Sequence, residues 1–470
     1  MFDQRTLTHL RATEYGYLDE NHHVYLDYAG AGLPARFQLA MQAERITSGC
    51  YGNPHSENPT STATEELLVR TRRAVLRFFN ADPEQYAVIF TPNATGAMRL
   101  VGEAYPFDPR SPLVLTTDNH NSVNGLREYA KAQGTGTVYI PLDTPGLRVS
   151  DQAVHTALAQ AARNGRAGTE RAARGLFAYP AQSNFSGVWH PLEWIDTAHS
   201  LGYDVLLDAA AYVTTNRLDL AVLQPDFVAV SWYKVFGYPT GVGCLIARRP
   251  ALARLRRPWF AGGTIQMASA QGQWHRMTDD ESAFEDGTLN FLSIPDVEVG
   301  LDWIRGIGID TVHDHVTALT GRLLTGLAEL RHGSGAPMVR LYGPADTERR
   351  GGTVAMNFLD PQGRIVDERV VARDAAARTI SLRTGCFCNP GAGETVFGLG
   401  HSVLRRAAHD RLDTVDDYLA DLELPSGGAV RVSLGLASHL DDVETFLEFA
   451  AETYRDRIPE AATLPRRLRC

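Results

Sequence analysis

The sequence predicts an α/β protein, with a large domain built on a mainly parallel sheet and a smaller α+β domain after it. Between about residues 24 and 250, short apolar runs alternate with segments of helical periodicity. The runs are continuous rather than alternating, which is typical of parallel strands covered by helices on both faces. After about residue 300 the pattern changes to a long amphipathic helix followed by further strand candidates.

The predicted strands of the large domain are rich in valine, leucine, isoleucine and phenylalanine. Predicted helices lie between them, the first from about Ala94 and a later one over residues 191–201. We expect the strands at residues 86–91, 113–115, 175–179, 205–207 and 227–230.

The smaller domain is predicted from a helix over about residues 309–330 and from the strand candidates that follow this helix. These candidates lie at residues 338–342, 353–358, 379–383 and 429–434. We therefore expect three parts: an N-terminal arm that packs on the small domain (1–24), the large domain (25–300) and the small domain (301–470).

Composition and charge exclude several classes of protein. A net charge of -10 argues against nucleic-acid binding, because phosphate contacts need a basic surface. No run of about 18 uncharged apolar residues marks a transmembrane helix. The N-terminus has no basic segment followed by an apolar stretch, so we expect no secretory signal and a cytoplasmic protein.

Lysine is unusually scarce in this chain. It occurs only at Lys131 and Lys234, so nearly all of the 45 basic residues are arginine. A genome that favours arginine codons explains the bias but not the lysines that persist. A lysine amine can lose its proton and form a Schiff base, which arginine cannot do. Lys131 lies in a polar segment without candidate partners, so Lys234 is the candidate for this chemistry.

Lys234 and Asp208 each follow a predicted strand, at ends that open onto the same crevice of a parallel sheet. This pair suits pyridoxal 5′-phosphate (PLP), because the lysine can carry the aldehyde and the carboxylate can pair with the pyridine nitrogen. An aspartate at a strand end is by itself more often a helix cap or a metal ligand. Its combination with Lys234 favours the cofactor.

Further polar residues lie where a PLP molecule needs partners. Ala94 and Thr95 begin a predicted helix and offer N–H groups and a hydroxyl for a phosphate, although an ordinary helix cap is the alternative. Ser231 adds a hydroxyl three residues before Lys234. His120, one of 15 histidines, would lie over the pyridine ring unless it is merely solvated, and Asn184 would hydrogen-bond the ring hydroxyl.

The five cysteines are too few for a disulfide framework in 470 residues. Cys50 and Cys244 are predicted to be small buried residues. Cys386 and Cys388 are separated by one residue. The sequence has no CxxC pair that could complete a structural zinc site with them, so we expect no metal. We interpret one or both as reactive thiols, against the alternative of small residues in a packed turn. Cys470 is either incidental or a terminal thiol that relays sulfur.

Seven stretches carry a more specific signal: YLDYAGA at 25–31, YGNPHS at 51–56, PAQSNFSG at 180–187, LDAAA at 207–211, SWYKVFGYPTG at 231–241, FEDGT at 284–288 and SLRTGCFCNPG at 381–391. Together they resemble the fold-type I PLP enzymes of the class V aminotransferase group, which includes the cysteine desulfurases. Within this group the sequence is most similar to the N-terminal, aminotransferase-like domain of molybdenum cofactor sulfurases. The resemblance spans about residues 20–450 and implies a seven-stranded sheet in the large domain.

The resemblance implies a role in cofactor binding for each candidate. Lys234 would carry PLP, Asp208 would bind the ring nitrogen, His120 would stack on the ring and Asn184 would reach its hydroxyl. The phosphate would be held by Ala94, Thr95, Ser231 and Tyr233, and by Thr288 of the neighbouring subunit. The last contact implies a homodimer with shared active sites.

The resemblance also implies a desulfuration of L-cysteine or a related amino acid. Arg431 would clamp the α-carboxylate of the substrate, and Arg383 would orient the substrate or stabilise a thiolate. Cys388, or its neighbour Cys386, would take the sulfur as a persulfide and release alanine. An acceptor protein or metabolite would then receive the sulfur.

The sequence departs from the family pattern at a few positions. Gly393 or Glu394 stands where molybdenum cofactor sulfurases carry a further cysteine. We expect no molybdopterin-engaging domain after the small domain. We therefore expect the acceptor to be a separate protein, metabolite or cofactor-binding subunit. Ala211 and Tyr233 replace the glutamine and histidine of simple cysteine desulfurases.

Two other functions stay open. The first is a class V aminotransferase, epimerase or C–S lyase that acts on a specialised metabolite, since the fold alone does not determine the chemistry. The second is a non-catalytic PLP-fold scaffold for a sulfur-carrier partner, against which the preserved Lys234, Asp208 and Thr95 argue.

Overall fold

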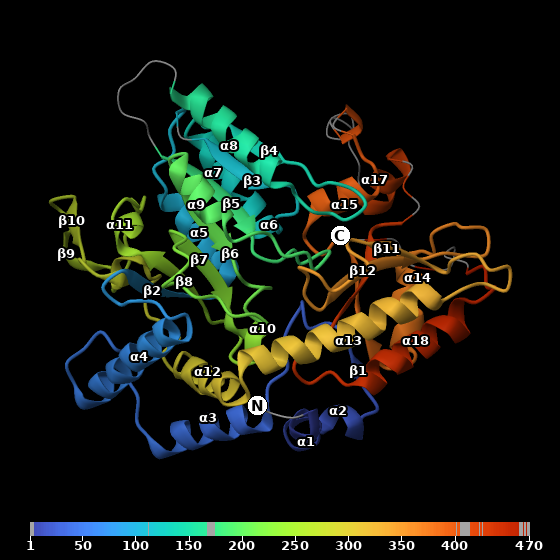
Figure 1. The fold of residues 1–470 in the computed structure, drawn as a ribbon. Coiled ribbons are helices and arrows are strands. Elements are labelled where there is room, and N and C mark those ends of the chain that lie inside the picture. Colours follow the sequence, from blue (N-terminus) through green and yellow to red (C-terminus); the bar gives the residue numbers. More distant parts are fainter. Residues whose placement is uncertain are drawn as a thin grey trace.

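Two sheets and a long helix between them organise the protein (Figure 1). The computed structural model describes residues 4–110, 112–166, 174–400, 402–404, 414–422, 424, 426–459, 464 and 467. Helix α13 (Ile309–Glu329) runs from the side of the larger sheet to the smaller one, where it packs against α18 (Leu440–Tyr454).

The larger sheet has seven strands in the order β2-β8-β7-β6-β5-β3-β4, and only β8 runs antiparallel to its neighbours. The prediction of a mainly parallel, seven-stranded α/β sheet is therefore confirmed. The strands are β2 (Tyr86–Thr91), β3 (Leu113–Thr116), β4 (Thr137–Ile140), β5 (Gly175–Pro180), β6 (Tyr203–Asp208), β7 (Phe227–Ser231) and β8 (Gly243–Arg248).

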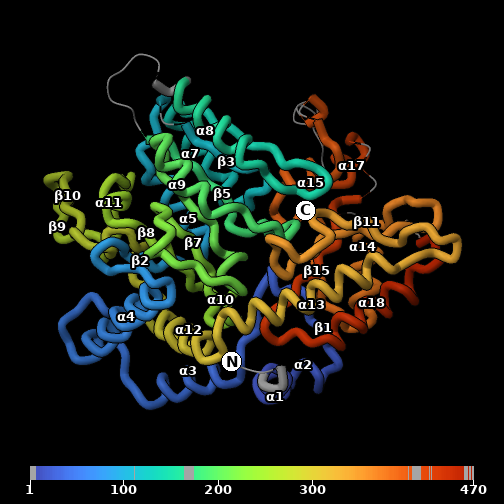
Figure 2. Tube along the Cα trace, viewed as in Figure 1, coloured from blue at the N-terminus to red at the C-terminus, as the bar shows by residue number. Residues whose placement is uncertain are grey.

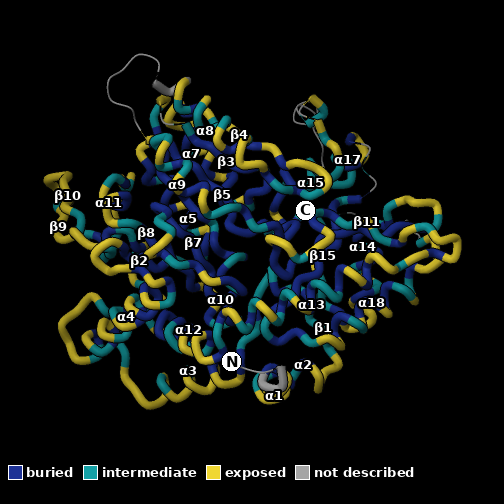
Figure 3. The backbone as a smooth tube through the Cα atoms, in the orientation of Figure 1, coloured by how far each residue is buried: buried dark blue, intermediate teal, exposed yellow. Residues whose placement is uncertain are grey.

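Helices cover both faces of this sheet because its strands are apolar on both sides. In β2, Val88 and Phe90 face one hydrophobic core, whereas Ala87 and Ile89 face another. Six of the seven strands are accordingly buried along most of their length, whereas the edge strand β4 is largely exposed (Figure 3). The helices of this part are α3 (Arg36–Ser48), α4 (Pro59–Phe78), α5 (Ala94–Ala104), α6 (Asn121–Asn124), α7 (Leu126–Ala132), α8 (Asp151–Arg166), α9 (Trp194–Ser200), α10 (Trp232–Phe236), α11 (Arg249–Leu252) and α12 (Pro295–Ile307), with the 3₁₀ helix η1 (Glu281–Phe284).

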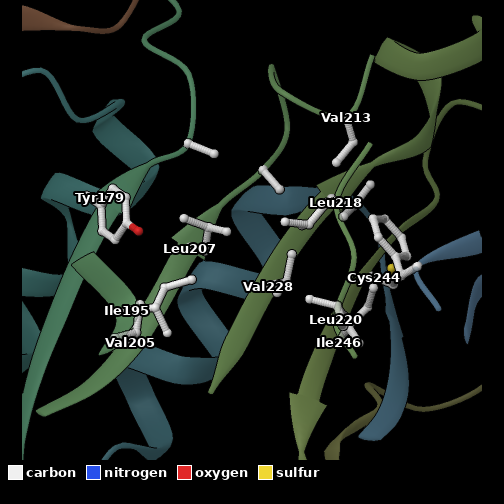
Figure 4. Close-up of a cluster of buried hydrophobic side chains, with 14 of the residues drawn as sticks. Tyr179, Ile195, Val205, Leu207, Val213, Leu218, Leu220, Val228, Cys244 and Ile246 are labelled. Carbon is white, nitrogen blue, oxygen red and sulfur yellow. The ribbon is translucent and has the colours of Figure 1, made fainter. Parts of the chain in front are cut away.

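Figure 4 shows part of the first core. Val205 and Leu207 of β6, Val228 of β7 and Ile246 of β8 belong to the same core, and Ile195 of α9 lies beside Val205. All five side chains are almost completely buried. At about 1.5–3 kcal/mol per buried aliphatic side chain, such packing holds the strand ends in register.

The smaller sheet is antiparallel, in the order β11-β12-β15-β14. Its strands are β11 (Val339–Tyr342), β12 (Thr353–Phe358), β14 (Arg383–Gly385) and β15 (Ala429–Ser433), and its further helices are α14 (Glu368–Ala376), α15 (Pro390–Val396) and α17 (Val415–Asp421). The strand predicted at 379–383 is divided in two. Its first part, β13 (Ile380–Ser381), pairs with β1 (Val24–Tyr25), and only β14 joins the smaller sheet.

The N-terminal residues lie beside the elements of the smaller sheet (Figure 2). Helices α1 (Gln4–Glu14) and α2 (Tyr17–Glu20) precede β1. Leu7 of α1 packs in the same core as α13 and α18, and Arg11 Nη1 lies 3.0 Å from Asp442 Oδ2 of α18. The three-part division stays a prediction.

Two features of the fold differ from the sequence analysis. Strands β4 and β8 and the exposed hairpin of β9 (Ile265–Ser269) and β10 (Trp274–Met277) were missed. Cys244 is buried in β8 as predicted, but the prediction that Cys50 is buried is wrong. Cys50 lies in the irregular segment between α3 and α4, where no neighbouring element covers it. Among the described helices, none is long and apolar enough to span a membrane.

Candidate active site

A cavity of about 610 Å³, a volume that includes its opening to solvent, lies at the carboxyl ends of the parallel strands. Polar residues gather there because each follows a strand: His120 after β3, Asn184 after β5, Asp208 at the end of β6 and Lys234 after β7. Eight predicted residues line the cavity: Ala94, Thr95, His120, Asn184, Asp208, Ser231, Tyr233 and Lys234.

Lys234 lies in α10, directly after β7. Burial lowers the pKa of its amine below the ordinary value of 10.5, and the positive charge of Arg431 acts in the same direction, while the nearby Asp208 opposes the shift. The amine makes no hydrogen bond to any residue of the described part of the chain. The site therefore favours the neutral, nucleophilic amine more than water does.

The carboxylate of Asp208 is oriented by the backbone two residues further along the chain. Its Oδ1 accepts a hydrogen bond of 3.0 Å from the N–H of Ala210. Its Oδ2 has no hydrogen bond within the described residues, and the side chain faces the cavity. One carboxylate oxygen is thus oriented and the other is available to a ligand.

The start of α5 forms another part of the cavity wall. Asn93 caps this helix, with its Oδ1 accepting from Gly96 N–H at 2.9 Å. Ser231 Oγ accepts a hydrogen bond from Ala94 N–H at 2.8 Å, so these two predicted phosphate ligands contact each other and tie the end of β7 to the helix. Thr95 is exposed to the cavity mouth. A helix N-terminus with two adjacent hydroxyls is suited to an anion.

His120 is connected to this wall through Ser122, which the sequence analysis missed. Ser122 Oγ lies 2.7 Å from Thr95 Oγ1 and 2.9 Å from His120 Nδ1. Ser122 N–H also donates to His120 Nδ1 at 3.1 Å, which leaves the other ring nitrogen directed away from this contact. Burial and then the charge of Lys234 lower the pKa of His120, which favours the neutral imidazole.

The side chain of Asn184 contacts the turn that follows β14 of the smaller sheet. Its Nδ2 donates to the carbonyl of Phe387 at 2.8 Å, and its Oδ1 accepts from Asn389 Nδ2 at 2.9 Å. Asn389 also donates to the carbonyl of Asp118 at 2.7 Å, two residues before His120. The amide of Asn184 therefore joins the cavity to the cysteine-bearing turn, which the sequence analysis did not foresee.

This turn presents Cys388 beside the cavity wall. Phe387 and Cys388 have φ angles of 55° and 53°, so both adopt the left-handed conformation that non-glycine residues rarely occupy. The N–H of Asn121 donates to the carbonyl of Cys388 at 2.7 Å, which places the turn next to His120. Cys388 is exposed and free, whereas Cys386 is disulfide-bonded. Of these two cysteines, only Cys388 is a free thiol. Cys470 lies outside the described residues.

Arg431 and Arg383 project from the paired strands β15 and β14 toward one carboxylate, that of Asp27. Arg431 also donates to the carbonyl of Asn184 at 3.0 Å, and its guanidinium lies 4.8 Å from the centre of the Phe387 ring. Neither arginine lines the cavity itself, but both interact electrostatically with Cys388. Asp27 belongs to a stretch that carries the family resemblance, yet no sequence signal gave it a role.

Thr288 does not line this cavity. It is exposed, and its Oγ1 accepts a hydrogen bond from Asn53 Nδ2 at 3.3 Å. It borders a second hollow that also includes Thr91, Pro92 and Gly96, on the other side of the start of α5. This position is on the surface of the single chain.

The residues of the cavity fit PLP. Lys234 offers an amine without a hydrogen-bond partner in the described chain, Asp208 offers an unengaged carboxylate oxygen, and the start of α5 offers a site for a phosphate. His120 lies between the start of α5, to which Ser122 connects it, and the turn that carries Cys388. An amine, a carboxylate and an anion site are the three groups that this cofactor needs.

Comparison with known proteins gives the class of protein. Residues 24–446 match the class-V aminotransferase family, so the chain belongs to this family, whose cofactor is PLP. The resemblance inferred from the sequence motifs is thereby confirmed.

Among curated relatives, the chain is 35% identical to a molybdenum cofactor sulfurase of Arabidopsis thaliana over 485 residues, which cover 96% of this chain and 58% of the relative. It is also 35% identical to a human molybdenum cofactor sulfurase over 475 residues, which cover 95% of this chain and 51% of the relative. The chain thus spans little more than half the length of these relatives.

Solved structures confirm the fold. An apo cysteine desulfurase of Thermococcus onnurineus NA1 superposes with a TM-score of 0.77 at 23% identity, covering 97% of this chain and 99% of the other. The cysteine desulfurase CsdA of Escherichia coli gives a TM-score of 0.73 at 20% identity, covering 97% and 100%.

Proposed function

We propose that this protein is a PLP-dependent cysteine desulfurase that keeps the sulfur of L-cysteine, or a related amino acid, on Cys388 and passes it to an acceptor. One observation carries the proposal: a free, exposed cysteine lies on a turn that is hydrogen-bonded to the wall of a PLP-type cavity. An aminotransferase has no need of a thiol at this position.

The chain's own residues supply the binding groups. Lys234 anchors the cofactor, Asp208 pairs with its ring nitrogen and the start of α5 with Thr95 binds its phosphate. When bound, PLP withdraws electrons from the α-carbon of an amino acid. Arg431, whose buried Nε has no partner among the described residues, is the proposed ligand of the substrate carboxylate.

Two groups of the cavity can serve as bases for proton transfer, Lys234 and His120. Burial lowers the pKa values of both Lys234 and His120, so the neutral form of each, which is the form that can accept a proton, is favoured more than in water. Lys234 is placed to move the proton of the substrate α-carbon, and His120 is placed between the cavity and the turn of Cys388.

The sulfur transfer balances without an added oxidant. The Cys388 sulfur attacks the substrate sulfur, an S–S bond forms and the bond between the substrate sulfur and its β-carbon breaks. The electron pair of that bond stays with the carbon, which takes up a proton, so L-cysteine and the Cys388 thiol become alanine and a Cys388 persulfide. Because Cys388 is exposed, an acceptor can reach this persulfide.

We also propose that two copies form a homodimer in which Thr288 contributes to the phosphate site of its neighbour. The exposed apolar side chains near Thr288 support this proposal, since large exposed patches usually mark an interface. Trp274 of the β9–β10 hairpin is 53% exposed, and Trp259, Phe260 and Met267 are also exposed. Arg257 connects this surface to the Thr288 segment by donating to the carbonyl of Glu285 at 3.2 Å.

The experiment that tests the proposed reaction compares Cys388→Ser with Cys50→Ser, which removes the other exposed free thiol among the described residues. Each holoenzyme is incubated with L-cysteine, alanine is quantified with and without a reductant, and mass spectrometry locates any added sulfur. We expect one added sulfur on Cys388 in the wild type and in Cys50→Ser. In Cys388→Ser we expect no persulfide and a loss of alanine formation of about 100-fold or more. Unchanged alanine formation in Cys388→Ser would show that Cys388 does not attack the substrate sulfur, whereas a product other than alanine in the wild type would favour a class V C–S lyase or aminotransferase.

A further inference from the structure

One carboxylate joins the two arginines of the proposed substrate site. Asp27 Oδ1 accepts from Arg431 Nη2 at 2.9 Å. Asp27 Oδ2 accepts from Arg383 Nη2 at 2.7 Å and from Arg383 Nε at 3.1 Å. The side chains are 4% exposed for Arg431, 14% for Asp27 and 50% for Arg383, so the cluster extends from the interior to the solvent.

The backbone holds Asp27 in this position. Residue 27 forms a parallel bridge with Ser433, two residues after Arg431 on β15, and the N–H of Ala29 donates to Ser433 Oγ at 2.8 Å. Gly30 leaves the room that the ion pair needs. A Cβ at Gly30 would lie 2.6 Å from Arg383 Nη2 and closer still to Asp27 Oδ2. The position of the carboxylate is therefore built into the fold.

This arrangement determines how many anionic groups the cluster can accept. Two arginines and one aspartate carry a net charge of about one positive unit, which matches one carboxylate. Arg431 keeps a buried Nε without a partner in the described chain, whereas Nε and Nη2 of Arg383 are both engaged by Asp27. A second anionic group on the substrate would have to compete with Asp27 for Arg383.

We propose that Asp27 determines the charge of the substrate: it restricts the site to amino acids with a single carboxylate and disfavours those whose side chain carries a second negative charge. The inference rests on the proposed function, in which Arg431 binds the α-carboxylate. Asp27 acts by occupying Arg383 and by repelling a second anion, and it does not contact the reacting atoms. It is a specificity-determining residue rather than a catalytic one.

The test compares two amino acids that differ in side-chain charge, L-alanine and L-aspartate, by calorimetric titration of the holoenzyme. The ratio of their dissociation constants is measured in the wild type, in Asp27→Asn and in Asp27→Glu. We expect the ratio to shift toward L-aspartate by about tenfold in Asp27→Asn, the effect of freeing one charge-assisted pair. Asp27→Glu, which keeps the charge, should stay near the wild-type ratio. Glu20→Gln breaks an exposed ion pair with Arg36 (2.9 Å) and is the matched control with no shift expected.

A second variant covers the case in which Asp27→Asn does not fold. Gly30→Ala forces Asp27 and Arg383 apart without changing any charge, and it should shift the ratio in the same direction. An unchanged ratio in the Asp27 and Gly30 variants would overturn the role of Asp27. A wild-type holoenzyme that binds neither amino acid would count against the proposed substrate class instead, so the two failures are distinguishable.

Discussion

The cofactor cavity and the cysteine turn meet at one site but are constructed differently. Lys234 and Asp208 lie at the ends of buried parallel strands, where backbone pairing and core packing determine their positions. The turn with Phe387 and Cys388 is instead left-handed at two successive residues and is held by hydrogen bonds from the side chains of Asn184 and Asn389. The turn also belongs to the smaller sheet, through β14.

This difference indicates that the two regions have different tasks. A cofactor anchor must stay fixed, and the strand ends provide this because they cannot move without disturbing the core. A thiol that accepts sulfur and passes it on must contact both a substrate and an acceptor. A turn held by a few side-chain hydrogen bonds, each worth about 0.5–1.5 kcal/mol, can change position at low cost.

The largest effect is expected from removing the anchor of the rigid region. Lys234→Ala should abolish covalent attachment of PLP and reduce activity by roughly 10³-fold or more, the scale on which loss of a covalent catalyst acts. Lys131→Ala removes the only other lysine and should change neither the attachment of PLP nor the activity. Visible absorption spectra and alanine formation measure both outcomes. A Lys234→Ala protein with the wild-type spectrum would show that the anchor lies elsewhere.

A smaller effect is expected from loosening the turn. Asn389→Ala removes the contacts with Asn184 and Asp118 as well as the cap on α15, where Asn389 Oδ1 accepts from Ala392 N–H at 3.2 Å. We expect kcat to fall about tenfold, while PLP affinity falls less, because Lys234, Asp208 and the start of α5 make none of these bonds.

The control for this prediction is another helix cap. Asn58 caps α4, with its Oδ1 accepting from Ser61 N–H at 3.0 Å, and it is exposed. Asn58→Ala should lower the free energy of unfolding by about 1 kcal/mol without changing kcat. Chemical denaturation and steady-state kinetics separate the two effects. Equal losses of kcat in both variants would mean that Asn389 acts through stability alone.

The smallest effect concerns the pH at which PLP becomes attached to the apoenzyme. Attachment needs the neutral amine of Lys234, so its rate should rise with pH and level off once this amine has lost its proton. Because burial lowers the pKa of Lys234, the midpoint should lie below the value of 10.5 found for an ordinary lysine. Asp208 opposes the shift, so Asp208→Asn should lower the midpoint further. A midpoint at 10.5 or above, measured by the absorbance of the attached cofactor, would contradict the buried position of the amine.

The sequence by itself determined the fold class, the residues at the strand ends and the choice of Lys234, since apolar runs and the polar residues after them follow from local patterns. Only the tertiary structure decided the rest. It engages Asn184 with the turn, leaves Cys388 free while Cys386 is in a disulfide, exposes Cys50 and places Asp27 between two arginines. These contacts join residues that are far apart in the chain, as Asp27 and Arg431 are. Their partners depend on how the elements of the smaller sheet pack against those of the larger one, which no local pattern encodes.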